Sequence, residues 1–433
     1  MKPPRILSLV LLTLVAALIV LAPLGLAATP EKLVIVNSGS LAGTTAAVAA
    51  FTEKTGIPVE VNAFTWNEWD EKLPIMLATG QQVDLIRFDT SHAAQYALEG
   101  WLVPLTPLAE RDPDVDLSLI AQAALWHGPY DRLGEIYTIP YNIAAHVMFY
   151  DRKLLQEAGL AEFPTEHGHP DLQWDAWLET VKKLTKRGSD GEVTQWGTAA
   201  LGSDGYYLIG LWDVDWVTDD LSRFRGADPD VVEAFTRMTD LWLRDGVAPP
   251  ADRRAGFSLL DRNIATNVRQ TGSWMNSLDP TQNDLGVAPI PWGKKVAVQG
   301  GINSWGISKT TEHLDAAWEF LKFFTFGEGI IHWMEHESRS PVLNRAYGAH
   351  WIEQTQANLP NADLSVILDA ASHWWSTQLY LSPAQQRINA LFLPAVASVG
   401  RGEKPAAVAM QEIADAVNRI LQAEPPTFTV KQR

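Results

Sequence analysis

The sequence contains no cysteine in 433 residues. This absence excludes disulfide bonds, thiolate-bound zinc and cysteine nucleophiles. It also excludes a lipid anchor attached through a cysteine.

Positive charge is scarce in this chain. Lys and Arg number 34 against 51 Asp and Glu, which gives a formal net charge of -17. A chain of this charge repels nucleic acid and anionic lipid, so we expect no nucleic-acid partner. A content of 46% hydrophobic and 20% charged residues is typical of a globular protein. The length favours two domains over a single core.

Signatures of catalytic and cofactor sites are missing as well. The sequence has no Walker loop, no dinucleotide-binding glycine fingerprint after its first strand and no G-x-S-x-G elbow, and we expect no cofactor. His332, Glu335 and His336 form an H-x-x-E-H pattern, but no third ligand is marked, so we expect no metal there. His167 and His169, in an HGHP loop, are expected to be solvent-exposed.

Long hydrophobic runs are absent except at the N-terminus. Lys2 and Arg5 precede an apolar run over residues 6–22, and Gly25-Leu26-Ala27 offers a small-x-small cleavage site. We predict a signal peptide over residues 1–27, cleaved after Ala27. An uncleaved anchor is the alternative, because the run approaches the roughly 18 residues that suggest a spanning helix. In both cases the folded part is exported.

The residues that follow alternate between strand and helix patterns. Strands are predicted over residues 32–36, 57–64 and 84–88, and helices over residues 41–54, 66–79 and 93–98. This β-α-β-α-β order with short connections predicts a parallel sheet covered by helices on both faces. Ligands of such sheets sit at the carboxyl ends of the strands.

Polar side chains stand at two of these strand ends. Ser38 and Ser40 follow the first strand, where hydroxyls and free backbone N–H groups can meet an oxygen-rich ligand. An ordinary helix cap explains them equally well. Arg87 and Asp89 end the third strand; a carboxylate beside an arginine suits paired hydroxyls, although Asp89 can also serve as a structural cap.

A second organising segment covers residues 137–155, YTIPYNIAAHVMFYDRKLL. A strand stops at Pro140, Tyr141 and Asn142 follow, a second apolar run covers residues 144–150, and Asp151 can cap a helix. This order predicts a chain that leaves one sheet and enters another. A strand pair inside a single domain is the alternative.

Tryptophan is abundant, with 18 residues. An indole ring can cover the apolar C–H face of a sugar while polar side chains bind its hydroxyls. Most of these residues belong to the core. Trp66, Trp274 and Trp305 lie beside predicted strand ends and are the best stacking candidates, with Trp374 and Trp375 as further ones.

The segment 137–155 resembles the "lPY…lYYNkdLfkeaGL" pattern of the family 1 extracellular solute-binding proteins, the sugar-type receptors of bacterial ABC importers. Further motifs of that family follow in order over residues 32–422: QWDAWLETVKKLT at 173–185, GSW at 272–274, DLGVAPIP at 284–291, GGINSWGISK at 300–309 and LDAAWEFLKFFT at 314–325. The spacing of the last motif predicts an amphipathic helix over residues 314–325, with Ala317, Phe320, Leu321 and Phe324 on its apolar face. Gln173 replaces the threonine cap of the family pattern, so we expect a weaker helix cap or one moved to Asp171. The strand at 268–271, VRQT, is unusually polar.

The resemblance implies an α/β, two-lobed periplasmic-binding-protein fold of type II. Each lobe would be a mostly parallel sheet flanked by helices, with a cleft between the lobes. Residues 32–142 and 300–345 would form the N-terminal lobe, and residues 143–299 and 346–425 the C-terminal lobe. The chain would cross between them near Asn142, near Gly300 and after Val342.

The implied function is that of an extracytoplasmic substrate-binding protein. It would bind a sugar or oligosaccharide in the cleft, without turnover, and deliver it to the permease subunits of an ABC importer. We expect a monomer in the periplasm or outside the cell, held at the membrane by the permease or by an uncleaved anchor. Strand ends and resemblance together predict these ligand contacts: Ser38, Ser40, Trp66, Arg87, Asp89, Tyr141, Asn142, Trp274, Gly301, Asn303, Trp305 and Arg339.

Three alternatives stay open. A glycerol-phosphate or polyol receptor of the same family would be favoured by a second cation in the cleft besides Arg87 and Arg339. An exported carbohydrate-active hydrolase would need two carboxylates facing one cleft, which the composition allows but no spacing pairs. A sugar-binding partner of a membrane sensor would bind the same ligands.

Overall fold

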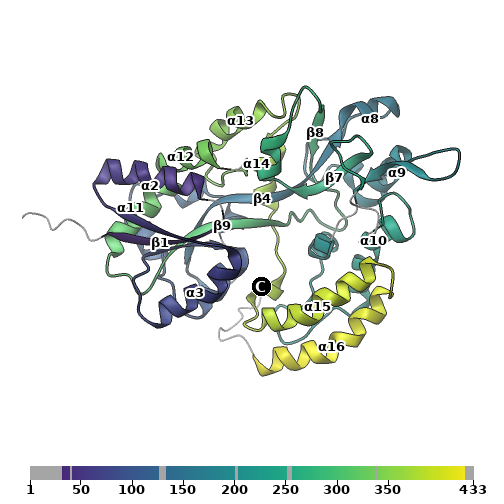
Figure 1. Cartoon of the computed structure of the whole chain (residues 1–433). Coiled ribbons are helices and arrows are strands. Elements are labelled where there is room, and N and C mark those ends of the chain that lie inside the picture. The colour runs from purple at the N-terminus through teal and green to yellow at the C-terminus, as the bar shows by residue number, and fades with distance from the viewer. Residues whose placement is uncertain are drawn as a thin grey trace, which may run out of the picture.

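The computed structural model describes residues 32–39, 41–125, 133–199, 203–250, 256–337 and 340–424. The predicted signal peptide, Ser40 and Arg339 lie outside these ranges. Two groups of elements are joined by the long strands β4 and β9, which run across the middle of the molecule (Figure 1). Within the described ranges, no helix combines the length and the apolar character needed to cross a membrane.

The helices and strands have these bounds. The first part of the chain forms β1 (Leu33–Ser38), α2 (Ala42–Thr55), β2 (Val59–Phe64), α3 (Trp66–Ala78), β3 (Leu85–Asp89), α4 (Thr90–Leu98), α5 (Thr106–Arg111), α6 (Gln122–Leu125), β4 (Thr138–Asp151), α8 (Arg152–Glu157), α9 (Trp174–Leu184), β5 (Lys186–Arg187), β6 (Val193–Thr198), η3 (Ser203–Trp212) and α10 (Pro229–Leu243). The second part forms β7 (Ile264–Gln270), η5 (Ser273–Ser277), β8 (Leu285–Ala288), β9 (Gly300–Ile307), α11 (Leu314–Thr325), α12 (Gly329–His336), α13 (Gly348–Gln356), α14 (Ser365–Ala370), η7 (Ala371–His373), η8 (Gln378–Leu381), α15 (Gln385–Gly400) and α16 (Ala406–Ala423).

The β-α-β-α-β order predicted for the N-terminal region is confirmed. Strand β1 pairs in parallel with β2 on one side and with β3 on the other. Side chains alternate between two cores: Ile35 packs in the cluster that contains α2, whereas Val36 packs in the cluster that contains α3 and α4. Helix α3 starts at a capping box in which Thr65 accepts from the Glu68 N–H group.

Strand β4 corrects one sequence prediction. Pro140 was expected to end a strand, but β4 runs unbroken through 14 residues, Thr138–Asp151. Its register against β9 shifts between Pro140 and Asn142. Proline has no N–H group to donate, and a bulge is one of the places where a strand tolerates that loss. The break read from the sequence is therefore a bulge inside one long strand.

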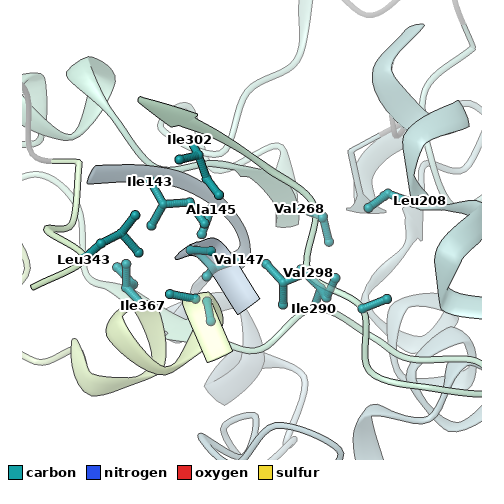
Figure 2. Packing of buried hydrophobic residues seen from close by; sticks show 14 of the residues in the cluster. Ile143, Ala145, Val147, Leu208, Val268, Ile290, Val298, Ile302, Leu343 and Ile367 are labelled. Atoms are coloured by element: carbon teal, nitrogen blue, oxygen red, sulfur yellow. The ribbon is translucent and has the colours of Figure 1, made fainter. Parts of the chain in front are cut away.

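The two halves of β4 pair with different partners. Its first half pairs with β9, ending at Ala145 opposite Gly300. Its second half pairs with β7 and β8, starting at His146 opposite Gln270. A third segment lies along the same stretch, since the Ile143 N–H group donates to Pro341 O over 3.0 Å. Figure 2 shows that buried side chains from these segments form one continuous core across the junction.

The sheet also corrects the expectation of mostly parallel pairing in each lobe. Parallel pairs are β1 with β2, β1 with β3, and β6 with β7. Strands β4 and β9 pair antiparallel with each other and with their other neighbours. The two strands carry the chain in opposite directions, β4 out of the N-terminal region and β9 back into it, so they cannot run parallel. The residue bounds predicted for the two lobes stay a prediction.

Several local predictions are confirmed by helix caps and faces. Asp151 caps α8 by accepting from the Leu154 N–H group over 2.9 Å. The cap of α9 has not moved to Asp171, because the Gln173 side chain itself accepts from the Asp175 N–H group over 2.9 Å. Helix α11 has the predicted bounds, and its expected face, Ala317, Phe320, Leu321 and Phe324, is fully buried.

Candidate ligand-binding site

Arg87 ties three strand segments together at the carboxyl end of the N-terminal sheet. Its Nη1 atom donates to Ser38 O over 2.7 Å and to Ser38 Oγ over 3.1 Å. Its Nε atom donates to the Tyr141 hydroxyl over 3.3 Å. Burial raises the pKa of Tyr141, against the lowering effect of the Arg87 charge, so this phenol stays a neutral hydrogen-bonding group. The structure thus brings three predicted site residues into one hydrogen-bonded group.

Asp89 follows at the end of β3 and binds His92. Its Oδ1 atom accepts from the His92 N–H group over 3.0 Å and lies 2.9 Å from His92 Nδ1. The other ring nitrogen, Nε2, lies 2.8 Å from Asp70 Oδ1. Burial opposes the charged imidazole, but Asp89 and Asp70 outweigh burial and raise the pKa of His92. Asp89 therefore has a structural role whatever else it binds, and His92 is a member of the group that sequence reasoning missed.

A row of small and polar residues crosses the junction of the sheet. Asp89 lies opposite Asn303, and Asn303 lies opposite Asn142. Two pairs further along, Gly301 lies opposite Ala144. Directly opposed residues share a face, as do alternate residues along a strand. We call these five residues, Asp89, Asn142, Ala144, Gly301 and Asn303, the junction strip.

The junction strip is the open side of the crossing strands. Ala144, Gly301 and Asn303 are partly exposed, whereas their neighbours Ile143 and Ile302 are fully buried. No atom lies within 4 Å of the position that a Cβ atom on Gly301 would take. Asn142 is only 2% exposed, and its buried Oδ1 atom has no hydrogen-bond partner among the described residues. A ligand hydroxyl that reached this acceptor would satisfy it.

Trp374 lies beside one end of the junction strip. Its Nε1 atom donates to Gly300 O over 3.1 Å, and the following N–H group, of Trp375, donates to Val298 O over 2.8 Å. These two bonds hold residues 374 and 375 along the segment that enters β9. Both indoles are partly exposed. The position places an aromatic surface next to polar groups, which is the combination a sugar ring needs.

Trp274 occupies a different place, in η5 shortly after the end of β7. Its Nε1 atom donates to Gln270 O over 2.9 Å. Its ring packs edge-on against Phe149 with centroids 4.7 Å apart, and the Arg269 guanidinium lies 4.0 Å from the ring centroid. The side chain is partly exposed, so it is available to a ligand, but one of its surfaces is already covered by protein.

Trp305 is not available for stacking in this structure, which corrects that part of the prediction. It is 0% exposed and packs against Phe320, Phe324 and Tyr141 in the N-terminal core. Its place opposite Arg87 in the sheet explains the sequence signal, but α11 covers it. Trp66 is the first residue of α3, and its side chain lies outside the described part of the structure.

The histidines of the two sequence motifs contact other groups of the protein. In α12, His336 Nδ1 lies 3.0 Å from His332 O, and His332 Nδ1 lies 4.0 Å from Glu335 Oε2. No group of three metal-ligating side chains occurs within the described ranges. His167 is only partly exposed, less than predicted: its ring lies 4.7 Å from that of His373, and burial lowers its pKa.

The fold and the site together define a class. A β-α-β-α-β lobe, a second lobe reached by crossing strands and an open polar strip at their junction are the architecture of two-lobed solute-binding proteins. The chain belongs to the bacterial extracellular solute-binding protein family, whose family model matches residues 37–329.

Known proteins agree with this assignment. The chain is 23% identical over 276 residues to the maltotriose-binding protein of Pyrococcus abyssi; the match covers 60% of the chain and 55% of that relative, so it spans about half of the relative's length. The fold is similar to that of the sugar-binding protein MalE from Xanthomonas citri, with a TM-score of 0.75, 18% identity and coverage of 90% of this chain and 98% of that one. A substrate-binding protein from Listeria monocytogenes, in complex with cycloalternan, matches with a TM-score of 0.69, 20% identity and coverage of 90% and 99%.

Proposed function

We propose that this protein is the extracytoplasmic substrate-binding protein of an ABC importer, and that it binds a sugar or oligosaccharide between its lobes. The observation that carries the proposal is the junction strip with Trp374 beside it. The family assignment supports it, as do relatives named for binding maltotriose, cycloalternan and other sugars. The protein acts by binding and release, as a monomer exported from the cell, and presents the loaded form to a membrane permease.

Each part of the strip has a task in this proposal. Asp89, Asn142 and Asn303 bind sugar hydroxyls through carboxylate and amide groups. Ala144 and Gly301 have little or no side chain, so a ring can approach the backbone closely. Trp374 covers an apolar C–H face. Arg87 positions the end of β1 through its bonds to Ser38 and fixes the Tyr141 hydroxyl.

Closure of the lobes follows from the same arrangement. The two proposed lobes meet where β4, β9 and residues 340–343 lie side by side. The N-terminal lobe comprises residues 32–142 and 300–345, and the C-terminal lobe comprises residues 143–299 and 346–425. A ligand on the strip touches residues from both sides of this junction. It stabilises the closed form by the difference between its contacts in the two forms, which is the energetic basis of hinge closure in such receptors.

Replacing Gly301 by leucine tests the site directly. No atom lies within 4 Å of a Cβ atom placed on Gly301, so Gly301→Leu should fold normally and block the approach of a ligand. Gly256→Leu is the matched control, because that glycine is exposed and also has no atom within 4 Å of its Cβ position.

The measurement is isothermal titration of the mature protein with maltotriose, maltose and other neutral saccharides. We expect saturable binding by the wild type and by Gly256→Leu, and a loss of at least tenfold in affinity for Gly301→Leu with an unchanged melting temperature. Equal affinity in all three proteins would remove the strip from the site. Folded wild-type protein that binds no saccharide would contradict the proposed function.

A further inference from the structure

The polar face of the crossing strands continues past the junction strip to Gln299, the residue immediately before β9. In the antiparallel pairing of β4 with β9, Gly301 lies opposite Ala144. Two residues further along, His146 lies opposite Gln299, since the His146 N–H group donates to Gln299 O over 2.9 Å. Opposed residues share a face, and so do alternate residues along a strand. Gln299 therefore lies on the same face as Gly301.

Hydrogen bonds fix the backbone at Gln299 from both sides. On the side of β4, His146 Nδ1 also lies 2.9 Å from Gln299 O. On the other side, the Val298 N–H group donates to His373 O over 2.8 Å, and the Trp375 N–H group donates to Val298 O over 2.8 Å. The chain is thus held extended up to the start of β9, and the face on which Gln299 lies is set by these bonds.

The side-chain amide of Gln299 is buried without a partner. Gln299 is 7% exposed, and its Oε1 atom has no hydrogen-bond partner within the described ranges. In those ranges, Asn142 is the other residue with a buried and unpaired amide oxygen. Asn344 shows the ordinary arrangement, because its amide donates to Thr325 O and accepts from the Ala346 N–H group, each over 3.0 Å. Buried polar groups are nearly always paired, so two unpaired oxygens on one face indicate a partner from outside the chain.

The two unpaired oxygens lie at the two ends of a bare stretch. Asn142 lies opposite Asn303. Gln299 is four residues from Asn303, so their Cα atoms are about 13 Å apart, since each residue advances a strand by about 3.3 Å. Between the two ends, Ala144 and Gly301 have little or no side chain, and no atom lies within 4 Å of a Cβ atom placed on Gly301. One sugar ring is shorter than this stretch, whereas two linked rings span it.

The chemistry of the amide fits a sugar hydroxyl. A carboxamide oxygen accepts hydrogen bonds, and a hydroxyl group can donate one. The glutamine side chain has several rotatable bonds, so its amide can turn toward the space over Gly301, its neighbour on the same face. An anionic group would bring only acceptors to this oxygen and would leave it unpaired.

We propose that Gln299 is a ligand-binding residue, and that the natural ligand is a saccharide of at least two linked rings that lies along the crossing strands from Asn142 to Gln299. The inference rests on the proposed function and narrows its substrate class. One ring meets Asn142 and Asn303, and the next ring donates a hydroxyl to Gln299 Oε1. A monosaccharide reaches only one end and leaves the other amide oxygen unpaired, so it binds more weakly.

Saccharides that differ in ring number test the length of the ligand. Glucose is compared with maltose and cellobiose, and xylose with xylobiose, by isothermal titration of the mature protein. We expect at least one disaccharide to bind the wild type at least tenfold more tightly than its monosaccharide. A monosaccharide without measurable binding beside a disaccharide that binds gives the same result.

Variants assign the effect to the residue. Gln299→Met keeps the length of the side chain and removes the amide. Because the amide oxygen is unpaired, the melting temperature should stay unchanged or rise, while affinity for the disaccharide falls at least tenfold and affinity for the monosaccharide stays within twofold. Gln195→Met is the matched control: Gln195 is 6% exposed, but its Nε2 atom donates to Leu184 O over 2.7 Å. That variant should lower the melting temperature and leave affinity unchanged.

The outcomes separate the two proposals. If saccharides bind and no disaccharide exceeds its monosaccharide tenfold, the ligand length is refuted while the proposed function stands. If Gln299→Met behaves like Gln195→Met, with a lower melting temperature and unchanged affinity, Gln299 is a structural residue and its assignment is refuted. An equal loss of affinity for both ring numbers would refute its place at the second ring. If no saccharide binds folded wild-type protein, the proposed function itself fails.

Discussion

Two tryptophans that look equivalent in the sequence should respond in opposite ways to truncation. Trp305 is fully buried among aromatic rings, whereas Trp374 is partly exposed beside the junction strip. Trp305→Ala should therefore lower stability, and Trp374→Ala should chiefly lower ligand affinity. The pair tests whether burial in the structure distinguishes a core residue from a site residue.

The expected magnitudes follow from these surroundings. Truncating a buried tryptophan to alanine costs about 3–5 kcal/mol, from lost transfer free energy and the cavity left behind. Truncating Trp374 removes its hydrogen bond to Gly300 O, which is worth about 1 kcal/mol of stability. A stacked ring adds about 1 kcal/mol to binding and the covered apolar area about as much again, so affinity should fall by roughly 30-fold.

Urea denaturation measures the first effect, and titration with the best-binding saccharide measures the second. The reasoning would be refuted by a Trp374→Ala protein that loses as much stability as Trp305→Ala and keeps its affinity. It would also be refuted by a Trp305→Ala protein of unchanged stability. Circular dichroism of each variant controls for loss of the fold.

Two further predictions concern stability. The pKa of His92 is raised, so its bonds to two carboxylates stabilise the fold fully at a pH below the ordinary histidine pKa. This contribution is lost as the pH rises through the pKa of the folded state. Urea denaturation from pH 5.5 to 9 should show the loss in the wild type and not in His92→Gln, and a contribution that grows with pH would contradict the prediction. Gly197→Ala would place a Cβ atom 1.8 Å from Val181 O, so it should destabilise the protein by more than about 3 kcal/mol by the same assay. Gly256→Ala is the control, whereas Gly191→Ala is unsuitable because φ there is +85°. Equal stability of Gly197→Ala and Gly256→Ala would contradict the prediction and show that β6 shifts freely.

Local sequence patterns predicted much of the fold. Helix α11 was predicted with its bounds, and the alternation of β1, α2, β2, α3 and β3 was predicted in order, because apolar spacing and caps are properties of adjacent residues. The sequence predicted β4 as two strands separated at Pro140, whereas it is one strand. Whether Pro140 ends a strand or sits in a bulge depends on how β9 pairs with it, and β9 lies some 160 residues further along the chain.

The polar residues of the candidate site were predictable from the sequence, but the burial of the candidate residues and their grouping were not. Arg87, Asp89, Asn142, Gly301 and Asn303 were expected from strand ends and family motifs, and the structure gathers them around one junction. Their grouping could not be worked out from spacing, because residues at 89, 142 and 303 become neighbours only through strand register. Register is set by burial of one face of each strand against the rest of the core.

The sequence by itself determined the composition class, the absence of thiol chemistry, the order of the elements and the family, since each depends on residue types and short spacings. Only the tertiary structure decided which tryptophans are core and which remain exposed, which face of the crossing strands is open, and that the Gln299 amide oxygen is buried without a partner among the described residues. Burial and hydrogen-bond pairing are sums over neighbours that are distant in the chain. Such sums exist only once the strands have paired and the helices have covered them.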